Sequence, residues 1–278
     1  MRAQRGLALV MVLWVSMLLS LLAGSYAFGV RTETRVMADL RGRAEARALA
    51  EAAVVFFGVM LADQQERELL PLNGTPLVWT FSGRDVSVRI TDVSGLVDLN
   101  QASRPLLRRA VIWAGVPAGE EDSAVDSLLD WQDGNSLREL NGAEDEDYIR
   151  AGYPAGAKDD AFESVEEVGQ VFGISPDVAR RLAEISTVHG NAGINPDAAP
   201  VEVLAMLGDD EAVLQADETG EDAYAMELPP SEHYGAAGTG GTFRIGVTVG
   251  GDAGEKYRFT SVIEPDAAGL TRVLAWRE

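Results

Sequence analysis

Hydrophobic positions divide the chain into one long apolar run, a short group of strands, a helical middle and a second group of strands. The apolar run extends from Leu7 to Val30 without a charge, and Arg2 and Arg5 precede it. A helix over this run is roughly 36 Å long, enough to cross a hydrocarbon core of about 30 Å. The basic residues favour a cytoplasmic N-terminus, with the bulk of the chain on the other side of the membrane.

Three interpretations of this run compete. A secretory signal peptide has a small-x-small cleavage site at Ser25-Tyr26-Ala27. A plain anchor stays uncleaved. A prepilin-type leader ends at Gly6, with the cut before Leu7, so that the mature protein keeps the whole apolar helix.

The sequence after the apolar run favours the prepilin interpretation. Residues 31–68 are rich in Ala, Leu, Arg and Glu and contain no Pro, so we expect one helix from about Leu7 to Glu68 whose outer part is amphipathic. Its stripe recurs at helical spacing and comprises Ala44, Ala48, Glu51, Val55 and Val59. Pro71 and Asn73-Gly74 end the pattern. A signal peptide needs no such continuation.

Two groups of strands flank the helical middle. Leu77–Phe81 and Val86–Ile90 surround a turn at residues 82–85, which predicts a hairpin. Residues 105–207 have helical periodicity, and strands return at residues 243–249, 257–263 and 270–276. We therefore predict an α+β protein in which a small antiparallel sheet packs on the N-terminal helix and a helical domain is inserted between its strands. The predicted segments are 1–6 (leader), 7–30 (transmembrane), 31–95 (helix and first strands), 96–210 (insert), 211–241 (linker) and 242–278 (last strands).

A weak internal repeat lies in the insert. Gly95–Ala102 resembles Gly193–Ala199, and an apolar helix follows each. Asn or Asp before a helix can cap its N–H groups, so paired capping turns are one explanation. The alternative is a helix-hairpin-helix or SAM-like fold, which the turn Phe172–Pro176 also suggests. The repeat lacks the basic residues that grip phosphate.

Charge and composition exclude several classes of function. The chain has 23 Lys and Arg against 44 Asp and Glu, a formal net charge of −21, which speaks against nucleic-acid binding. It has no Cys, and its two histidines, His189 and His233, are too few for a multi-histidine metal centre. No nucleophile-elbow motif or phosphate-binding loop is present, so we expect no enzymatic activity and no catalytic residues.

The acidic residues concentrate between Pro117 and Gln170, with 16 acidic and 3 basic positions. Ca²⁺ takes six to eight oxygen ligands, and two short oxygen-rich loops that turn at Gly134 and Gly142 supply that chemistry. The spacing does not match an EF-hand loop, and Mg²⁺ fits less well because it prefers a rigid six-ligand cage. The predicted calcium ligands are Asp130, Asp133, Asn135, Glu144, Asp145 and Asp147. The alternative is a solvated acidic surface, against which the neighbouring aromatic residues Trp131 and Tyr148 argue.

These motifs together resemble one family. They are Gln4–Val10 with Trp14, Arg31-Thr32-Glu33, Gly95–Ala102, Asp130-Trp131-x-Asp133, Asn141–Asp145 and Gly193–Pro196. In this order and spacing they are similar to general secretion pathway protein K, the large minor pseudopilin of the type II secretion system. The resemblance covers residues 4–207 and continues loosely into the last strands. One departure is Gly134-Asn135, where the family more often has acidic residues, so Asn135 is a weaker ligand.

The resemblance implies a pilin fold with a large helical insert, cleavage by a prepilin peptidase after Gly6 and N-methylation of Leu7. It implies a single-pass protein of the bacterial inner membrane, in contact with its lipid, with most of the chain in the periplasm. It also implies calcium in the insert and a place at the pseudopilus tip beside the I- and J-type minor pseudopilins. There the protein primes pseudopilus assembly on the inner-membrane platform for the export of folded proteins.

Met11 departs from most pilin-like proteins, which resemble one another in carrying Glu at the fifth mature position. A buried Glu is costly unless it is paired, and its partner in a fibre is taken to be a neighbour's α-amine. Met11 removes that acceptor, which suits a subunit at the end of a fibre. The alternative is the simple loss of a dispensable residue.

Two other functions stay open at this point. One is an envelope-anchored helix-hairpin-helix module that binds calcium or DNA, which requires a basic face. The other is a secreted acid hydrolase, which requires processing near Ala27 and a soluble product.

Overall fold

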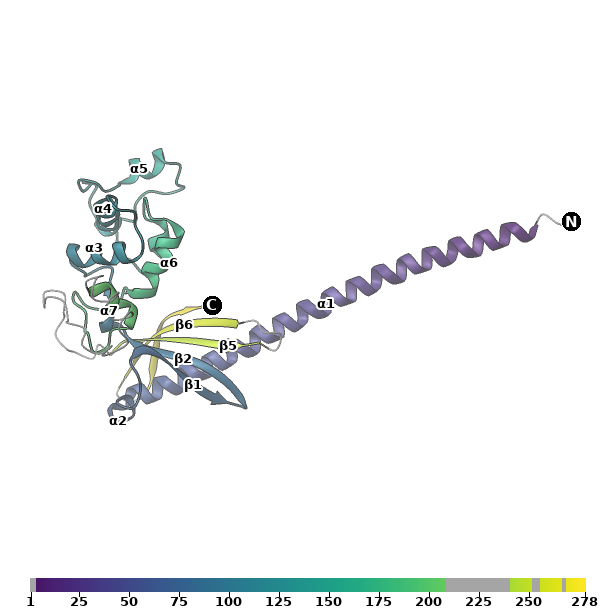
Figure 1. Cartoon of the computed structure of the whole chain (residues 1–278), viewed down its shortest axis with the longest axis horizontal. Helices are drawn as coiled ribbons and strands as arrows, with labels where there is room; N and C mark the ends of the chain where they lie inside the picture. The colour runs from purple at the N-terminus through teal and green to yellow at the C-terminus, as the bar shows by residue number, and fades with distance from the viewer. Residues whose placement is uncertain (1–3, 209–240, 252–255, 267–268) are drawn as a thin grey trace, which may run out of the picture.

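The computed structural model describes residues 4–208, 241–251, 256–266 and 269–278. A single helix, α1 (Gln4–Ala62), extends far beyond the rest of the molecule (Figure 1). Its segment Leu9–Tyr26 has a mean hydropathy of 2.0 and is not buried at all, so α1 contains one stretch long and apolar enough to span a membrane. The helix ends earlier than the predicted Glu68, because the Asp63 carboxylate accepts hydrogen bonds from Gln65 and Glu66 N–H groups and starts the short α2 (Gln64–Arg67).

Five strands form one antiparallel sheet with the order β1-β2-β5-β6-β7. They are β1 (Asn73–Phe81), β2 (Arg84–Asp92), β5 (Phe243–Gly250), β6 (Lys256–Pro265) and β7 (Thr271–Arg277). The hairpin between β1 and β2 turns on only Ser82 and Gly83, both with positive φ, rather than on the four residues expected. The α+β class and the strands of both predicted groups are confirmed.

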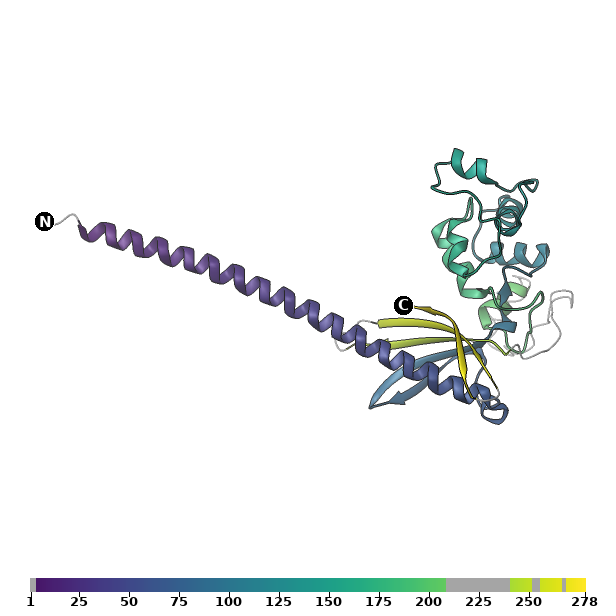
Figure 2. The ribbon, with the colours of Figure 1, turned by 180° about the vertical axis from the view of Figure 1, so that it is seen from behind.

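The first core lies between α1 and one face of this sheet (Figure 2). Strand residues alternate, so Val86, Val88 and Ile90 of β2 point towards α1 and their neighbours point away from it. The helix residues buried in this core are Ala46, Leu49, Ala50, Ala53, Val54, Phe57 and Leu61. Each large apolar side chain buried here contributes about 1.5–3 kcal/mol.

The stripe identified from the sequence is not the face that α1 buries. Ala44, Ala48, Glu51, Val55 and Val59 are all exposed, and Val55 and Val59 are 65% and 55% exposed. Helical spacing fits both faces because α1 is apolar on two sides in this region. One side packs on the sheet, and the other remains uncovered in this structure.

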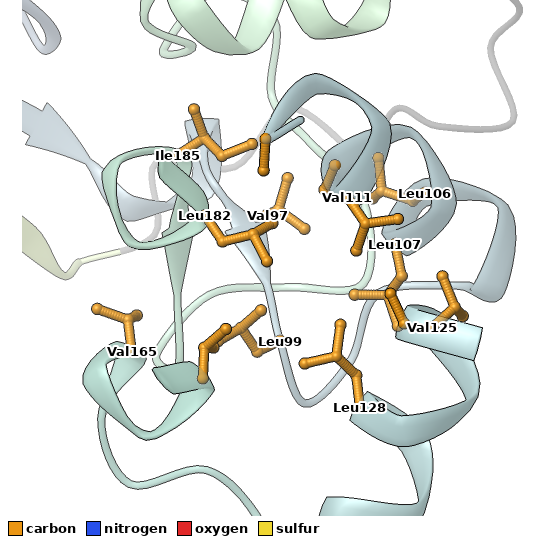
Figure 3. Close-up of a cluster of buried hydrophobic side chains, with 14 of the residues drawn as sticks. Val97, Leu99, Leu106, Leu107, Val111, Val125, Leu128, Val165, Leu182 and Ile185 are labelled. Atoms are coloured by element: carbon orange, nitrogen blue, oxygen red, sulfur yellow. The ribbon is translucent and has the colours of Figure 1, made fainter. Parts of the chain in front are cut away.

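The insert connects β2 to β5, which are adjacent strands of the sheet. It therefore stands at the end of the sheet where β2 ends and β5 begins (Figure 1). Its helices are α3 (Arg104–Trp113), α4 (Glu121–Gln132), α5 (Asp145–Arg150), α6 (Pro176–Ile185) and α7 (Val201–Leu207), with the 3₁₀ turns η1 (Val93–Gly95) and η2 (Val165–Gln170). The insert has its own core, in which Leu99, Leu107, Leu128 and Leu182 meet (Figure 3).

The two halves of the internal repeat lie against each other. The first half contains β3 (Val97–Asp98) and the second half follows β4 (Ser186–Thr187), and these two strands form a small parallel pair. Asn195 N–H donates to the Ser94 carbonyl at 2.8 Å, and Gly95 packs so closely on the Ala198 backbone that a Cβ there would overlap it. Only glycine fits this contact.

The repeat does not cap the helices that follow it. The Asp98 carboxylate accepts from the N–H groups of Asn100 and Gln101, within the turn itself. Helices α3 and α7 begin after Ser103 and Pro200, and neither makes a side-chain cap. The capping explanation is wrong in this respect, because a local Asx turn satisfies the Asp98 carboxylate first. The helix-hairpin-helix or SAM-like description of the insert stays a prediction, and the predicted linker 211–241 lies outside the described residues except for Gly241.

Candidate functional site

Buried aromatic side chains form the scaffold of the acidic region. Trp131 at the end of α4 lies 6.0 Å from Tyr148 of α5 and 6.3 Å from Phe162, measured between ring centroids. The Tyr148 hydroxyl accepts a hydrogen bond from Phe172 N–H at 2.8 Å, and burial raises its pKa to about 12. These contacts fix α4 and α5 relative to each other, so their carboxylates belong to a packed scaffold.

Asp130 of α4 has no solvent exposure. Its Oδ1 accepts from Glu139 N–H at 2.9 Å, whereas Oδ2 has no hydrogen-bond partner among the described residues. Gly142 lies against this carboxylate, where any Cβ would overlap it. Burial raises the pKa of Asp130, although the hydrogen bond from Glu139 N–H and the nearby Ala143 N–H, which meets neither oxygen in hydrogen-bond geometry, lower it in part. A buried carboxylate oxygen without a partner is energetically costly, so a hydrogen-bond donor or a cation bound to Oδ2 would be stabilising.

Glu144, at the start of α5, also has a buried carboxylate oxygen without a partner among the described residues. It is 9% exposed, and its Oε1 has no hydrogen-bond partner within the described chain. Burial, together with the negative charges of Asp130, Asp159, Asp133 and Asp145, raises its pKa to about 7. The sequence motifs thus bring four predicted ligands into one electrostatic neighbourhood.

Asp159 belongs to this neighbourhood, although the sequence analysis did not select it. Its φ is +56°, a left-handed conformation that is uncommon outside glycine, and burial together with Asp145 and Asp133 raises its pKa. Asp145 packs on Gly156, where a Cβ would overlap its carboxylate. The signal available in the sequence was the pair Asp159-Asp160 after Gly156, but its distance from the other acidic loops concealed it.

Two of the predicted ligands have other contacts. Asn135 donates its side-chain N–H to Asp133 at 2.8 Å, and its side-chain oxygen Oδ1 accepts from Leu137 N–H. Asp147 forms ion pairs with Arg138 at 3.3 Å and Arg150 at 2.9 Å. The hydrogen bond from Glu144 N–H lowers the pKa of Asp147 most, and these two arginines lower it further. Among the residues that the structure describes, no three Asp, Glu or His side chains are arranged to hold a metal ion. The calcium ligand set therefore stays a prediction.

A second surface feature lies on the exposed side of α1. Phe56 of α1 stacks on Trp79 of β1 at 5.4 Å, and Trp79 stacks on Phe81 at 4.9 Å. Phe56 and Phe81 are 45% and 46% exposed, and they border a shallow groove of about 630 Å³ with Val55. We call this the aromatic groove (Val55, Phe56, Trp79 and Phe81, with Ala48, Glu51 and Ala52). The groove is not visible in the sequence, because its aromatic residues come from both α1 and β1.

The processing and assembly positions lie on α1. Gly6 and Leu7 are within the helix, and Met11 is 62% exposed. The structure does not test cleavage or methylation. His189 packs near the Asp98 carboxylate in the insert, and burial lowers its pKa, while His233 lies outside the described residues.

Comparison with known families addresses the insert directly. Residues 90–191 match the family model described as "Type II secretion system (T2SS), protein K". The chain carries a protein K domain. This protein K domain includes the acidic neighbourhood from Asp130 to Asp159, and the match confirms the resemblance that the sequence motifs indicated.

A solved structure has a similar arrangement of elements. A chain of the GspK-GspI-GspJ complex from the enterotoxigenic Escherichia coli type 2 secretion system superposes with a TM-score of 0.61. The sequences are 15% identical, and the match covers 88% of this chain and 98% of that one. At this identity the likeness shows the fold, which includes the protein K domain and the helix and sheet that carry it. Comparison with curated protein sequences gives no match.

Proposed function

We propose that this chain is a non-enzymatic minor pseudopilin that occupies the tip of the type II secretion pseudopilus and primes its assembly for the export of folded proteins. The observation that carries the proposal is the protein K domain at residues 90–191, inserted between two adjacent strands of a sheet that packs on a membrane-length helix. In this account the chain is a single-pass protein of the inner membrane, in contact with its lipid, with its sheet and insert in the periplasm. Prepilin peptidase cuts it before Leu7.

The tip position is supported by shape and by one residue. The insert stands beyond the end of the sheet farthest from the N-terminus (Figure 2). A further subunit stacked on that end would meet the insert. Met11 lacks the carboxylate that a neighbouring α-amine needs, so the chain can end a fibre.

The exposed stripe of α1 supports helix-to-helix assembly with other minor pseudopilins, of the I and J types, on the inner-membrane platform. Val55 and Val59 are one helical turn apart and continue into the aromatic groove. Large exposed apolar surfaces are uncommon on proteins that act alone. A partner helix laid along this stripe covers it.

Val55→Glu tests this assembly surface. The substitution places a charge in the centre of the stripe without touching the residues that α1 buries on the sheet. We expect co-purification with the I-type pseudopilin and protein secretion to fall by about tenfold, with an unchanged melting temperature. Val201→Glu, at a position 72% exposed on α7, is the matched control and retains both activities. Normal co-purification and secretion by Val55→Glu overturn the proposed role of the stripe.

The proposal includes calcium in the acidic neighbourhood. The unpartnered oxygens Asp130 Oδ2 and Glu144 Oε1 support it, because a bound cation is a partner for both. Asp133, Asp145 and Asp159 lie close enough to raise the pKa of a neighbouring carboxyl, so they are the further candidates. Ca²⁺ accepts the irregular oxygen geometry that such loops offer. Its role there is to hold the loops before and after α5 in one arrangement.

Thermal unfolding of the full chain in detergent measures this binding, because a ligand that binds only the folded state stabilises it. We expect millimolar Ca²⁺ to raise the melting temperature of the wild type and to have no effect on Glu144→Gln or Asp133→Asn. Asp147→Asn is the matched control, since Asp147 is already paired with two arginines. A wild type that does not respond to Ca²⁺ overturns the calcium assignment.

A further inference from the structure

The face of the sheet that points away from α1 is the floor of a groove of about 820 Å³. Strand alternation places Arg89 of β2 and Arg258 of β6 on this face, because Val88 and Phe259 beside them are buried in the core under α1. Gly246 of β5 pairs with Arg89 across the strands and has no side chain to fill the space between them. We call this the sheet groove.

Three cations in the sheet groove have no acidic partner among the described residues. Of the hydrogen bonds that the structure describes, Arg89 donates one long bond, 3.4 Å, to the Gly74 carbonyl. Within the described part of the chain, Arg89, Lys256 and Arg258 form no ion pair, whereas Arg84, Arg272 and Arg277 on the same sheet all do. The chain has a formal net charge of −21, so these three cations make the sheet groove a local positive patch on an acidic protein.

The other charged groups of the groove lie at its margins or are already paired. Arg244 donates its hydrogen bonds to carbonyls at the end of α6. Glu184 pairs with Arg180, and the Asp85 carboxylate accepts from the Thr80 hydroxyl. Glu202 lines the groove from the insert. The floor is thus cationic, and the two glutamates stand on the wall that the insert provides.

We propose that the sheet groove binds an extended acidic polypeptide segment of a partner protein. Strand β5 lies between the strands of Arg89 and Arg258, so the backbones of these two residues are about 10 Å apart. Acidic side chains on one face of an extended peptide recur every ~7 Å. The long arginine side chains can make up the difference between these two spacings. Serine and threonine hydroxyls on the floor (Ser87, Thr248 and Thr260) add hydrogen bonds. The inference goes beyond the pseudopilin role and does not depend on it.

The glutamates select a peptide over a nucleic acid. A nucleic-acid backbone has closely spaced phosphates and no N–H donors, so Glu184 and Glu202 repel it. A peptide has backbone N–H groups that these carboxylates can accept from, and its acidic side chains are spaced more widely. Charge complementarity of this kind affects association rate and salt dependence most.

Fluorescence anisotropy with the full chain in neutral detergent tests the proposal. The probe is a labelled peptide of alternating Glu and Ser, compared with the same peptide carrying Gln for Glu and with an oligothymidylate. The variant is R89Q/R258Q, and R41Q/R272Q is its control, because it removes the same charge from two exposed, ion-paired arginines whose partners do not line the groove. Melting temperatures show whether all variants fold.

We expect the acidic peptide to bind the wild type and the control alike, more weakly as salt rises, and at least about tenfold more weakly to R89Q/R258Q. Binding that the groove variant leaves unchanged overturns the proposal, as does preference for the oligothymidylate or for the Gln peptide. Residues 209–240 contain nine Asp and Glu and no Lys or Arg. If the wild type binds no peptide but a chain with those nine residues changed to Asn and Gln does, the chain competes with itself and the proposed partner segment is wrong.

Discussion

The Arg244 guanidinium of β5 donates a hydrogen bond to the Glu184 carbonyl at the end of α6, with Nη1 and O 3.2 Å apart. The same side chain also donates to the carbonyls of Ala183 and Ser186. The last carbonyls of a helix lack partners within the helix, and a cation there also meets the negative end of its dipole. This one arginine therefore connects the sheet to the insert. Burial lowers its pKa to about 10, which leaves it charged at neutral pH.

Replacement of Arg244 by Gln is expected to loosen the insert from the sheet. The change leaves partly buried helix-end carbonyls without donors, at a cost of about 1–3 kcal/mol in the free energy of unfolding. Chemical denaturation measures the loss, and hydrogen exchange should rise first at α6 and β4. Arg272→Gln, at an exposed ion pair, is the control with little effect. Equal stability of the two variants would contradict this role.

Gly95→Ala tests the contact between the two halves of the repeat. The new Cβ overlaps the Ala198 backbone, which cannot move aside as a flexible side chain does, so we expect a loss of about 1–3 kcal/mol. Gly169→Ala is the control, because its Cβ meets only Ala179 at an ordinary 3.8 Å. Urea unfolding monitored by tryptophan fluorescence compares the two. If Gly95→Ala is as stable as Gly169→Ala, the halves do not pack as described.

The pH dependence of stability follows from Glu144. Its pKa is about 7 in the folded, metal-free chain and about 4.5 when unfolded. A carboxyl whose pKa is raised by folding favours the folded state while protonated, so this contribution is complete below pH 4.5 and is lost as pH rises through 7. We expect the melting temperature in chelator to fall between about pH 5 and pH 8, and the Glu144→Gln variant to fall less.

Other carboxyls also contribute to the pH dependence of the melting temperature. The quantity to measure is therefore the difference in melting temperature between wild type and Glu144→Gln at each pH. Burial raises the pKa of Asp98 and Asp130, whereas the hydrogen bond from Glu144 N–H and the ion pairs with arginines lower that of Asp147. Parallel pH profiles for the two proteins would show that Glu144 titrates normally. Saturating Ca²⁺ should reverse the order of stability at pH 8, because the ionised Glu144 then has a partner.

Met11→Glu tests the argument about the fibre end. Met11 lies in the apolar segment of α1 and is exposed there, so the substitution should not disturb the folded sheet and insert. We expect unchanged melting of the extracted protein but fewer pseudopili per cell, since the new carboxylate can recruit a neighbour's α-amine. Met11→Leu is the control. Unchanged secretion and unchanged pilus number would count against the tip argument.

The sequence was sufficient for the features that depend on local periodicity. The alternation in Phe243–Val249 and the uncharged run after Gly6 each produce one element whatever the rest of the chain does. The buried face of α1 could not be predicted in this way. Val54 and Val55 are the same type of residue, and only the position of the sheet decides which of them is buried. Arg244 likewise appears in the sequence as one residue of a strand, and its partners lie some sixty positions away.

The acidic neighbourhood was likewise predictable only where it depends on local sequence. The clusters around Asp130 and Glu144 were recognisable from their density of oxygen ligands. Asp159 was not, because a loop brings it there from outside both clusters. The pairing of Asp147 with Arg138 and Arg150 was also invisible, since charge density alone does not distinguish an ion-paired carboxylate from a free one.

The N-terminus of the native protein, extracted from membranes and analysed by intact mass and peptide sequencing, tests the central claim most directly. The account predicts a chain that begins at N-methylated Leu7, which is the product of a prepilin peptidase and keeps all of the apolar helix. A chain that begins near Phe28, or that retains Met1, would contradict assembly as a pseudopilin.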